Sequence, residues 1–295
     1  MTVLFIHGID QQEFTAAQLL TTWTNNIEDV APGLLLNTPV QMAYYATILA
    51  EFSAGSFSSA TTMGSDLSNA NSAELNFCYD VLDEIAIANG LDLSTVQQVM
   101  SGETDDIVPM GSSLLRSIVR IAAALEKKAP QRTEIVLRLL KQAYIYLTVM
   151  SARRAVDSAV RPMIEQNPQI LITHSLGTVV AFNILQQLEK EMASIDIPLF
   201  ITLGSPLGLE AFKARLEGPR KKPGNVQRWV NFFDTSDIVT LGKNLDIDTF
   251  ADGIENDGTV NNKSKNAHSI AGYLIHQNLI DLLRNTINKE FNLRG

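Results

Sequence analysis

The 295-residue sequence contains a single cysteine, Cys78, and so cannot form an intramolecular disulfide. A lone cysteine of this kind is best interpreted as a small buried apolar side chain. The sequence also lacks an apolar run long enough to cross a bilayer as a helix. Its start, Met1-Thr-Val-Leu-Phe-Ile-His-Gly8, has no basic segment before the apolar one, which favours a core strand over a signal peptide. These absences predict a soluble, cytoplasmic protein without stable membrane insertion.

Basic residues are also in the minority. The chain has 23 Lys and Arg against 32 Asp and Glu, which gives a net charge of −9. Nucleic-acid-binding proteins carry basic patches, and anionic membranes attract basic segments, so this charge balance argues against both partners. The hydrophobic share of 45% is ordinary for a globular protein, and the length fits one large α/β domain or one domain with an insertion.

Short apolar segments alternate with helical patterns in both terminal parts of the chain. Strands are predicted at 3–6, 40–45, 169–173, 198–203 and 228–233, and helices at 15–30, 177–192, 209–216 and 269–288. Strands that alternate with helices form βαβ units, so we expect an α/β fold with a small, mostly parallel sheet and helices on both faces. A long polar loop is expected over 242–267, with a short strand near Thr259 and Val260 as an option.

The middle of the chain follows a different pattern. Residues 52–73 are rich in Ser, Ala, Thr, Gly and Asn, which is typical of a mobile loop. Helices are predicted over 75–89, 93–100, 112–129 and 133–161, and Pro162 is expected to end the last one. We therefore expect an α/β core formed by residues 1–49 and 166–295, and a helical insertion, residues 50–165, that forms a lid or cap.

Polar residues follow the ends of the predicted strands. Ligands of open α/β sheets bind outside the carboxyl ends of the strands, so these residues are the candidates for a functional site. They are His7, Gly8 and Ile9 after the first strand, Ser175 after 169–173, Ser205 and Glu210 after 198–203, Asp234 and Asp237 after 228–233, and His268 at the end of the long loop. A serine, carboxylates and a histidine are thus expected along one edge of the sheet, in the chain order Ser, Asp, His.

This set of residues suits nucleophilic catalysis. A serine hydroxyl is a weak nucleophile near neutral pH, and it needs a base and a carboxylate that orients the base. Ser175 lies at a corner between an apolar strand and an apolar helix, where the helix N-terminus offers an N–H group to an oxyanion. Gly177 lets the helix pass close to the strand. The alternative interpretation is a tight strand–helix turn with an idle serine.

The chain has four histidines, of which His268 is the best candidate base by elimination. His7 lies in the loop after the first strand. His174 adjoins Ser175 and should point away from it on a sharp turn. His276 lies inside the predicted closing helix, whereas His268 alone lies in a loop after the candidate acids and before a helix.

Three carboxylates are candidates for the acid. Asp237 is the first choice, because it lies a few residues past a strand end with room to turn towards His268. Asp234 is the second choice, although its side chain could instead fix the turn. Glu210, which follows the preceding strand, is the third.

Over residues 1–49 and 166–295 these segments resemble the α/β-hydrolase superfamily. Val3-Leu-Phe-Ile-His-Gly-Ile9 resembles the His-Gly loop of lipases and esterases, which implies that the N–H of Ile9 contributes to an oxyanion hole. Thr173-His-Ser-Leu-Gly177 resembles the nucleophile elbow, which implies that Ser175 is the nucleophile and that the N–H of Leu176 is the second oxyanion donor.

Three downstream segments carry the resemblance further. Leu203-Gly-Ser-Pro-Leu-Gly208 resembles the segment after the next strand in lipase-like members of the superfamily, including the inositol-deacylase-like and acyltransferase-like branches. Phe233-Asp-Thr-Ser-Asp-Ile-Val239 resembles the acid loop, whose second Asp is usually catalytic, and Ala267-His-Ser269 resembles the catalytic histidine loop. The chain departs from the family at Thr173, where the motif has glycine. It also starts at the strand of the His-Gly loop, so we expect the first two strands of the family to be missing.

The resemblance implies a serine esterase or lipase-like hydrolase that works through an acyl-enzyme and needs no metal or cofactor. Many apolar residues in the helical segment favour a small-molecule or lipid ester with an apolar acyl group, unless these residues only pack on the core. They include Leu114, Leu115, Ile118, Leu139, Leu140, Tyr144 and Leu147. The alternatives are a non-catalytic ligand-binding protein on a hydrolase scaffold and an acyltransferase.

Overall fold

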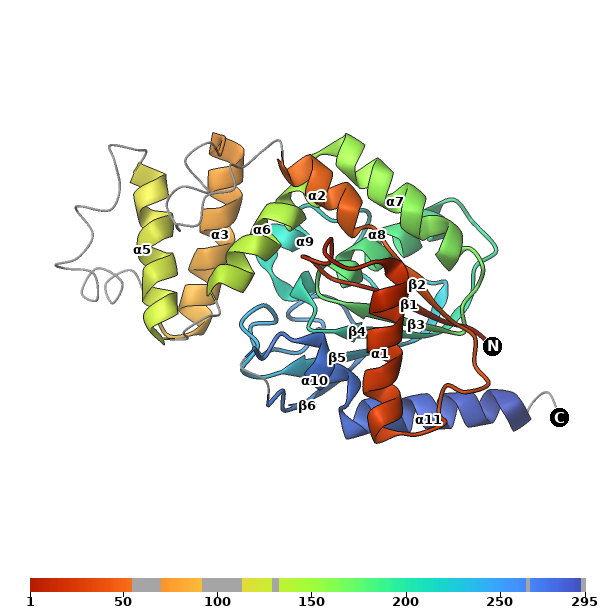
Figure 1. The fold of residues 1–295 in the computed structure, drawn as a ribbon. Helices are drawn as coiled ribbons and strands as arrows, with labels where there is room; N and C mark the ends of the chain where they lie inside the picture. The colour runs from red at the N-terminus through yellow and green to blue at the C-terminus, as the bar shows by residue number, and fades with distance from the viewer. Residues whose placement is uncertain (55–69, 92–112, 129–132, 264–265, 293–295) are drawn as a thin grey trace.

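The computed structural model describes residues 1–54, 70–91, 113–128, 133–263 and 266–292. Its centre is a six-stranded sheet with the strand order β2-β1-β3-β4-β5-β6, in which every neighbouring pair is parallel (Figure 1). The strands are β1 Val3–Ile6, β2 Val40–Ala43, β3 Ile170–His174, β4 Ile197–Leu203, β5 Val226–Asp234 and β6 Ile254–Val260. The predicted α/β class and parallel sheet are therefore confirmed.

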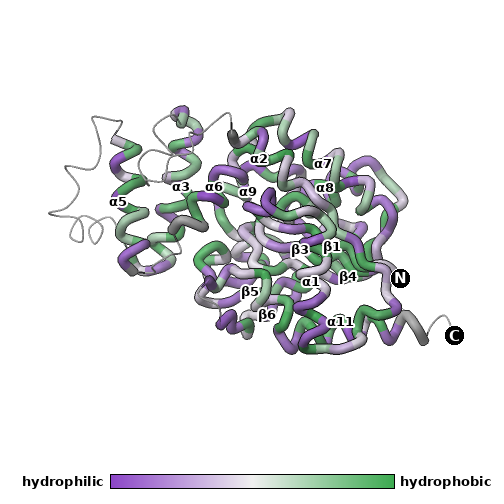
Figure 2. Tube along the Cα trace, in the orientation of Figure 1, coloured by the Kyte–Doolittle hydropathy of each residue, from purple (hydrophilic) through white to green (hydrophobic). Residues whose placement is uncertain are grey.

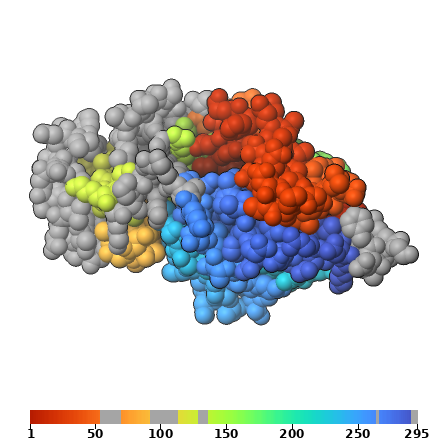
Figure 3. Space-filling model, turned by 60° about the horizontal axis from the view of Figure 1, so that its bottom comes forward, coloured from red at the N-terminus to blue at the C-terminus, as the bar shows by residue number. Residues whose placement is uncertain are grey.

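Helices cover both faces of the sheet. One face carries α1 Ala16–Val30, α10 Ile270–Leu274 and α11 Gln277–Asn292, and the other carries α2 Ala46–Ala54, α7 Met150–Ile164, α8 Leu176–Lys190 and α9 Glu210–Lys213. In Figure 3 the C-terminal residues (blue) lie beside the N-terminal residues (red), in agreement with the packing of α10 against α1. Helices on both faces explain why the strands read as nearly continuous apolar runs.

The alternation of side chains along each strand divides the core into two parts. Leu4 and Ile6 of β1 belong to the cluster under α7 and α8, whereas Val3 and Phe5 belong to the cluster under α1 and α11. Figure 2 shows the apolar residues concentrated along the central strands. The sheet is thus buried on both sides, which leaves its carboxyl edge for polar residues.

The prediction of one helix over 133–161 is wrong. The structure has two helices, α6 Thr133–Thr148 and α7, and the chain breaks between them at Val149. The guanidinium of Arg153, a residue of α7, donates to the carbonyls of Tyr146 and Leu147. These carbonyls lie in the last turn of α6, where the helix itself offers them no N–H donor. Pro162 does not end the helix either, because it lies in the last turn of α7.

Other boundaries also differ from the predictions. Residues 254–260 form the edge strand β6, where a polar loop with at most a short strand was expected. The closing helix is divided into α10 and α11, and His276 lies between them. The helix expected over 209–216 is shorter and follows a 3-10 turn, Pro206–Gly208. The sequence did not indicate α2.

The helical segment continues with α3 Ser72–Ala88 and α5 Ser113–Lys128, close to the predicted bounds. These helices and α6 pack on one another and extend to one side of the sheet (Figure 1). Most of the loop expected over 52–73 and the helix expected over 93–100 lie outside the described residues. The division of the chain at 50 and 165 stays a prediction, since α7 also packs against β1, β2 and α8. Among the described helices, none has the length and apolar character that a bilayer-spanning segment needs.

Gly177 allows α8 to pass close to the end of β1. A Cβ at this position would overlap the carbonyl oxygen of His7 and would lie 2.7 Å from that of Ile6. Because both are backbone atoms of a buried segment, we expect Gly177→Ala to lower the free energy of unfolding by about 1–3 kcal/mol, as measured by urea denaturation. Gly208→Ala is the control, since a Cβ there meets only a Leu245 side-chain carbon at 3.5 Å. Equal losses in the two variants would contradict this explanation.

Candidate active site

Several candidate residues lie where the order of the strands in the sheet reverses, between β1 and β3. The chain leaves β1 through α1 on one face and reaches β2, whereas it leaves β3 through α8 on the other face and reaches β4. The carboxyl ends of β1 and β3 therefore form a switch point, which is the usual place of a ligand crevice in an open α/β sheet. Ser175 lies directly after β3, and His7, Gly8 and Ile9 lie directly after β1.

Ser175 occupies a strained turn between β3 and α8. Its φ of 52° and ψ of −128° are rare for a residue with a side chain. The Ser175 N–H donates to the carbonyl of Leu203 at 3.0 Å, which anchors the turn to the neighbouring strand. The loop after β1 lies against the serine, because a Cβ on Gly8 would be 2.8 Å from the Cβ of Ser175.

Ser175, His268 and Asp237 form one chain of hydrogen bonds. The Oγ of Ser175 lies 2.8 Å from Nε2 of His268, and Nδ1 of His268 lies 2.8 Å from Oδ2 of Asp237. A carboxylate only accepts hydrogen bonds, so Nδ1 carries the proton and Nε2 is left to accept from the serine. The structure thus brings together three side chains that the sequence placed in separate loops, and all three are buried.

Asp237 is held as a buried carboxylate. Its Oδ2 also accepts from the hydroxyl of Tyr273 at 2.8 Å, and its Oδ1 accepts from the N–H of Val239 at 3.0 Å. Burial by itself raises the pKa of Asp237, but the attraction of His268 and these hydrogen bonds outweigh burial and leave the pKa below its usual value. The group is therefore ionised near neutral pH.

The other two candidate acids have different partners. Asp234 accepts from the N–H and hydroxyl of Ser236 through Oδ1 and from the N–H of Asn262 through Oδ2, each at 2.7 Å. Asp234 therefore holds the turn between β5 and Asp237 through Ser236, and it connects this turn to Asn262 in the segment before His268. Glu210 pairs with Lys213, and its side chain is 69% exposed. Neither carboxylate bonds to His268 in the described structure.

The segment after β4 borders Asp237 and His268. Gly204 has a φ of 57°, and a Cβ there would lie 3.2 Å from Oδ2 of Asp237 and 3.2 Å from Nδ1 of His268. A side chain at this position would press on the hydrogen bond between the two residues. The close approach explains why glycine follows β4.

The two candidate oxyanion donors flank Ser175. Leu176 is the first residue of α8, and the N–H of a first helical residue has no acceptor within its helix. Within the described ranges, no acceptor is found for the N–H of Ile9 either. Both N–H groups thus lack an acceptor among the described residues, which is a condition that an oxyanion hole must meet.

His7 holds the loop that carries Ile9. Its Nδ1 donates to the carbonyl of Gly8 at 2.7 Å, and its Nε2 accepts from the N–H of Tyr45 at 3.0 Å. The Tyr45 hydroxyl donates to the His7 carbonyl at 2.7 Å, and the two rings stack with centroids 4.2 Å apart. Burial lowers the pKa of His7 to about 4, so the ring is neutral near pH 7. Sequence reasoning missed Tyr45, which lies just beyond β2 without any motif.

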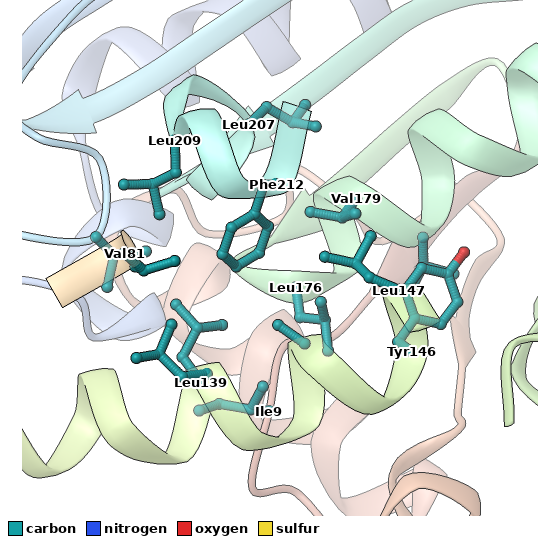
Figure 4. Close-up of a cluster of buried hydrophobic side chains, with 14 of the residues drawn as sticks. Ile9, Val81, Leu139, Tyr146, Leu147, Leu176, Val179, Leu207, Leu209 and Phe212 are labelled. Carbon is teal, nitrogen blue, oxygen red and sulfur yellow. The ribbon is translucent and has the colours of Figure 1, made fainter. Parts of the chain in front are cut away.

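The helical segment also contacts this loop. Arg138 and Gln142 of α6 donate to the carboxylate of Asp10, at 3.2 Å and 3.4 Å. The side chains of Ile9 and Leu176 lie in an apolar cluster with Leu139 of α6 (Figure 4). Further members are Val81 of α3, Leu207, Leu209 and Phe212. Ser175 itself is 1% exposed, so the candidate nucleophile is covered in this structure.

Comparisons with protein-family models, with curated proteins and with solved structures found no match to this chain.

The buried, neutral His7 makes folding sensitive to acid. Its pKa is about 4 when folded and near 6.5 when unfolded, so below pH 6.5 the unfolded chain takes up a proton that the folded chain does not. We expect this group to remove about 2 kcal/mol of folding stability between pH 7 and pH 5. His7→Gln cannot take up the proton and should lose correspondingly less over the same interval. Urea unfolding at both pH values measures this, and equal losses in the two proteins would contradict it.

Proposed function

We propose that the protein is a serine hydrolase of carboxylic esters, with Ser175 as the nucleophile, His268 as the base and Asp237 as the orienting acid. The observation that carries the proposal is the continuous hydrogen-bonded chain from Ser175 Oγ through His268 to Asp237 Oδ2, with 2.8 Å at each step. Such triads are recognised by geometry and roles rather than by sequence position.

The proposed reaction has two halves. His268 takes the proton of the Ser175 hydroxyl while Oγ attacks the ester carbonyl carbon, and the N–H groups of Ile9 and Leu176 stabilise the oxyanion. The His268 cation, stabilised by Asp237, gives its proton to the leaving alcohol, and the acyl-enzyme remains. His268 then takes a proton from water, which attacks the acyl-enzyme, and the acid leaves as the serine regains its proton.

The fold supports this proposal and its finer form, an α/β-hydrolase. Ser175 lies on a strained strand–turn–helix corner, which is the setting of a nucleophile elbow. The strand before Ser175, β3, lies between β1 and β4 in the sheet. The His-Gly loop follows β1, and Gly204, beside Asp237, follows β4. A six-stranded parallel sheet with helices on both faces is compatible with that fold.

The surroundings of the serine favour an apolar acyl group. Ile9 and Leu176, the two proposed oxyanion residues, direct their side chains into the apolar cluster that Leu139 and Phe212 share (Figure 4). An acyl chain that enters beside them would bury its surface against aliphatic and aromatic carbon. Because Ser175 is covered, we propose that the helical insertion acts as the lid. The reaction uses no metal or cofactor.

Labelling with a fluorophosphonate tests the proposed nucleophile. We expect one adduct by intact mass on the wild-type protein and none on Ser175→Ala, because only an activated serine reacts. His268→Ala should slow labelling about 10³-fold or more, since the serine loses its base. Ser205→Ala, which removes the serine after the next strand, is the matched control and should keep the adduct.

The same labelling is repeated with detergent micelles, which offer an apolar surface to a covered site. Absence of an adduct in both conditions, on folded protein, would contradict the hydrolase and favour a ligand-binding protein. If the adduct forms, aryl esters of increasing acyl length define the acyl preference. Acyl transfer to an added alcohol in preference to water would identify the acyltransferase alternative.

Separate variants of the three carboxylates test the choice of acid. Asp237→Asn should lower the labelling rate about 10³- to 10⁴-fold, because the amide favours the wrong tautomer of His268. Asp234→Asn should mainly lower the free energy of unfolding, since Asp234 holds the backbone of Asn262. Glu210→Gln should leave the labelling rate unchanged, because Glu210 bonds to Lys213 and not to His268. A rate loss in Asp234→Asn equal to that of Asp237→Asn, without loss of stability, would reverse the assignment.

A further inference from the structure

A second histidine, His174, contacts the proposed base directly. Its Nε2 lies 2.9 Å from the carbonyl oxygen of His268. A carbonyl oxygen only accepts hydrogen bonds, so Nε2 of His174 must carry a proton and donate it. The two rings also lie against each other, with centroids 4.9 Å apart and an angle of 35° between the planes.

The backbone around His268, the proposed base, accepts hydrogen bonds at three consecutive carbonyls. Nδ2 of Asn262 donates to the carbonyls of Ala267 and Ser269, at 3.2 Å and 2.6 Å, and His174 donates to the carbonyl between them. Asn262 belongs to the same loop region as the base. His174 instead ends β3 and directly precedes Ser175, so its hydrogen bond connects the base to the strand of the nucleophile.

His174 keeps this donor over a wide pH range. Burial, and next the neighbouring His268, lower the pKa of His174 to about 3. The other titratable groups near it are Asp237, His7 and Tyr273, whose ring centroid lies 6.0 Å away. A neutral His174 adds no positive charge beside His268, so it does not oppose the imidazolium that the proposed reaction forms.

We propose that His174 is a positioning residue for the base, which holds the His268 carbonyl so that Nε2 of the His268 ring faces Oγ of Ser175. This inference rests on the proposed function and adds a residue to it. A displacement of about 1 Å at a reacting group can lower a rate about 100-fold. Loss of the hydrogen bond should therefore reduce the chemical step and leave reagent binding unchanged.

Three substitutions of His174 separate the hydrogen bond from the bulk of the ring. His174→Phe keeps the ring and removes the donor. His174→Gln places an amide N–H near the position of Nε2, whereas the shorter His174→Asn does not reach the His268 carbonyl. The measured quantities are the maximal inactivation rate and the apparent affinity for a fluorophosphonate, from pH 5 to pH 9.

We expect the Phe and Asn variants to inactivate about 10- to 100-fold more slowly, with affinity unchanged within about threefold, and the Gln variant to recover most of the rate. His276→Phe is the matched control, because His276 lies between α10 and α11 beside Phe232 and Thr259, and it should react like the wild type. The Gln variant should also keep the pH dependence of the wild type.

Three results would overturn the inference. Wild-type rates in the Phe and Asn variants would show that the hydrogen bond does not matter. Equal rate losses in the Gln and Asn variants, with equal losses in unfolding free energy, would show a structural role only. Loss of the pH dependence in His174→Gln would show that His174 is itself a base.

A spectroscopic measurement keeps the test independent of reactivity. The Nδ1 proton that His268 shares with Asp237 should give a downfield proton resonance, which we expect to shift or broaden in the Phe and Asn variants and to persist in the Gln variant. If the wild-type protein does not react with the fluorophosphonate, that result contradicts the proposed function. The resonance then decides the inference about His174 by itself. An unchanged resonance in all three variants would overturn it.

Discussion

The hydrogen bond between Nδ1 of His268 and Oδ2 of Asp237 is the interaction on which the rest of the site depends. It selects the tautomer of His268 that can accept a proton from Ser175, and it joins the loop after β5 to the loop before α10. A buried carboxylate is costly unless it is paired and hydrogen-bonded, and Asp237 is both, through His268, Tyr273 and the backbone of Val239. The fold therefore stabilises the charge before any ligand binds.

The parallel sheet makes this meeting of residues possible. All six strands point the same way, so the segments that follow β1, β3, β4 and β5 emerge along one edge. Glycines bring these segments within contact distance, since a Cβ at Gly177 would overlap the backbone of His7 and a Cβ at Gly204 would crowd Asp237 and His268. Neutral, buried histidines then bond to the loops: His7 donates to the carbonyl of Gly8 next to Ile9, and His174 donates to the carbonyl of His268.

The helical segment is part of the same arrangement. Its helix α6 bonds to Asp10, next to Ile9, and contributes Leu139 to the apolar cluster around Leu176. The helical segment thus contacts the loop of Ile9 and the cluster that holds the side chain of Leu176, the two proposed oxyanion residues. In the proposed enzyme, a movement of α6 that admits substrate would also act on the loop after β1, so access and preorganisation of the site would be coupled.

The sequence alone determined the features that depend on local pattern. Apolar runs marked β1, β3, β4 and β5, because strands covered on both faces need continuous apolar residues. The strand–Ser–helix corner marked Ser175, and position after a strand or before a helix marked Asp237 and His268 as candidates. Tertiary structure alone decided that Asp237, and not Asp234, bonds to His268, and that Tyr273, Asn262 and His174 hold the pair. It also decided the break between α6 and α7, through Arg153, and the edge strand β6. These features depend on hydrogen bonds between side chains and backbone groups brought together by the fold, and such contacts leave no periodicity or motif in the chain.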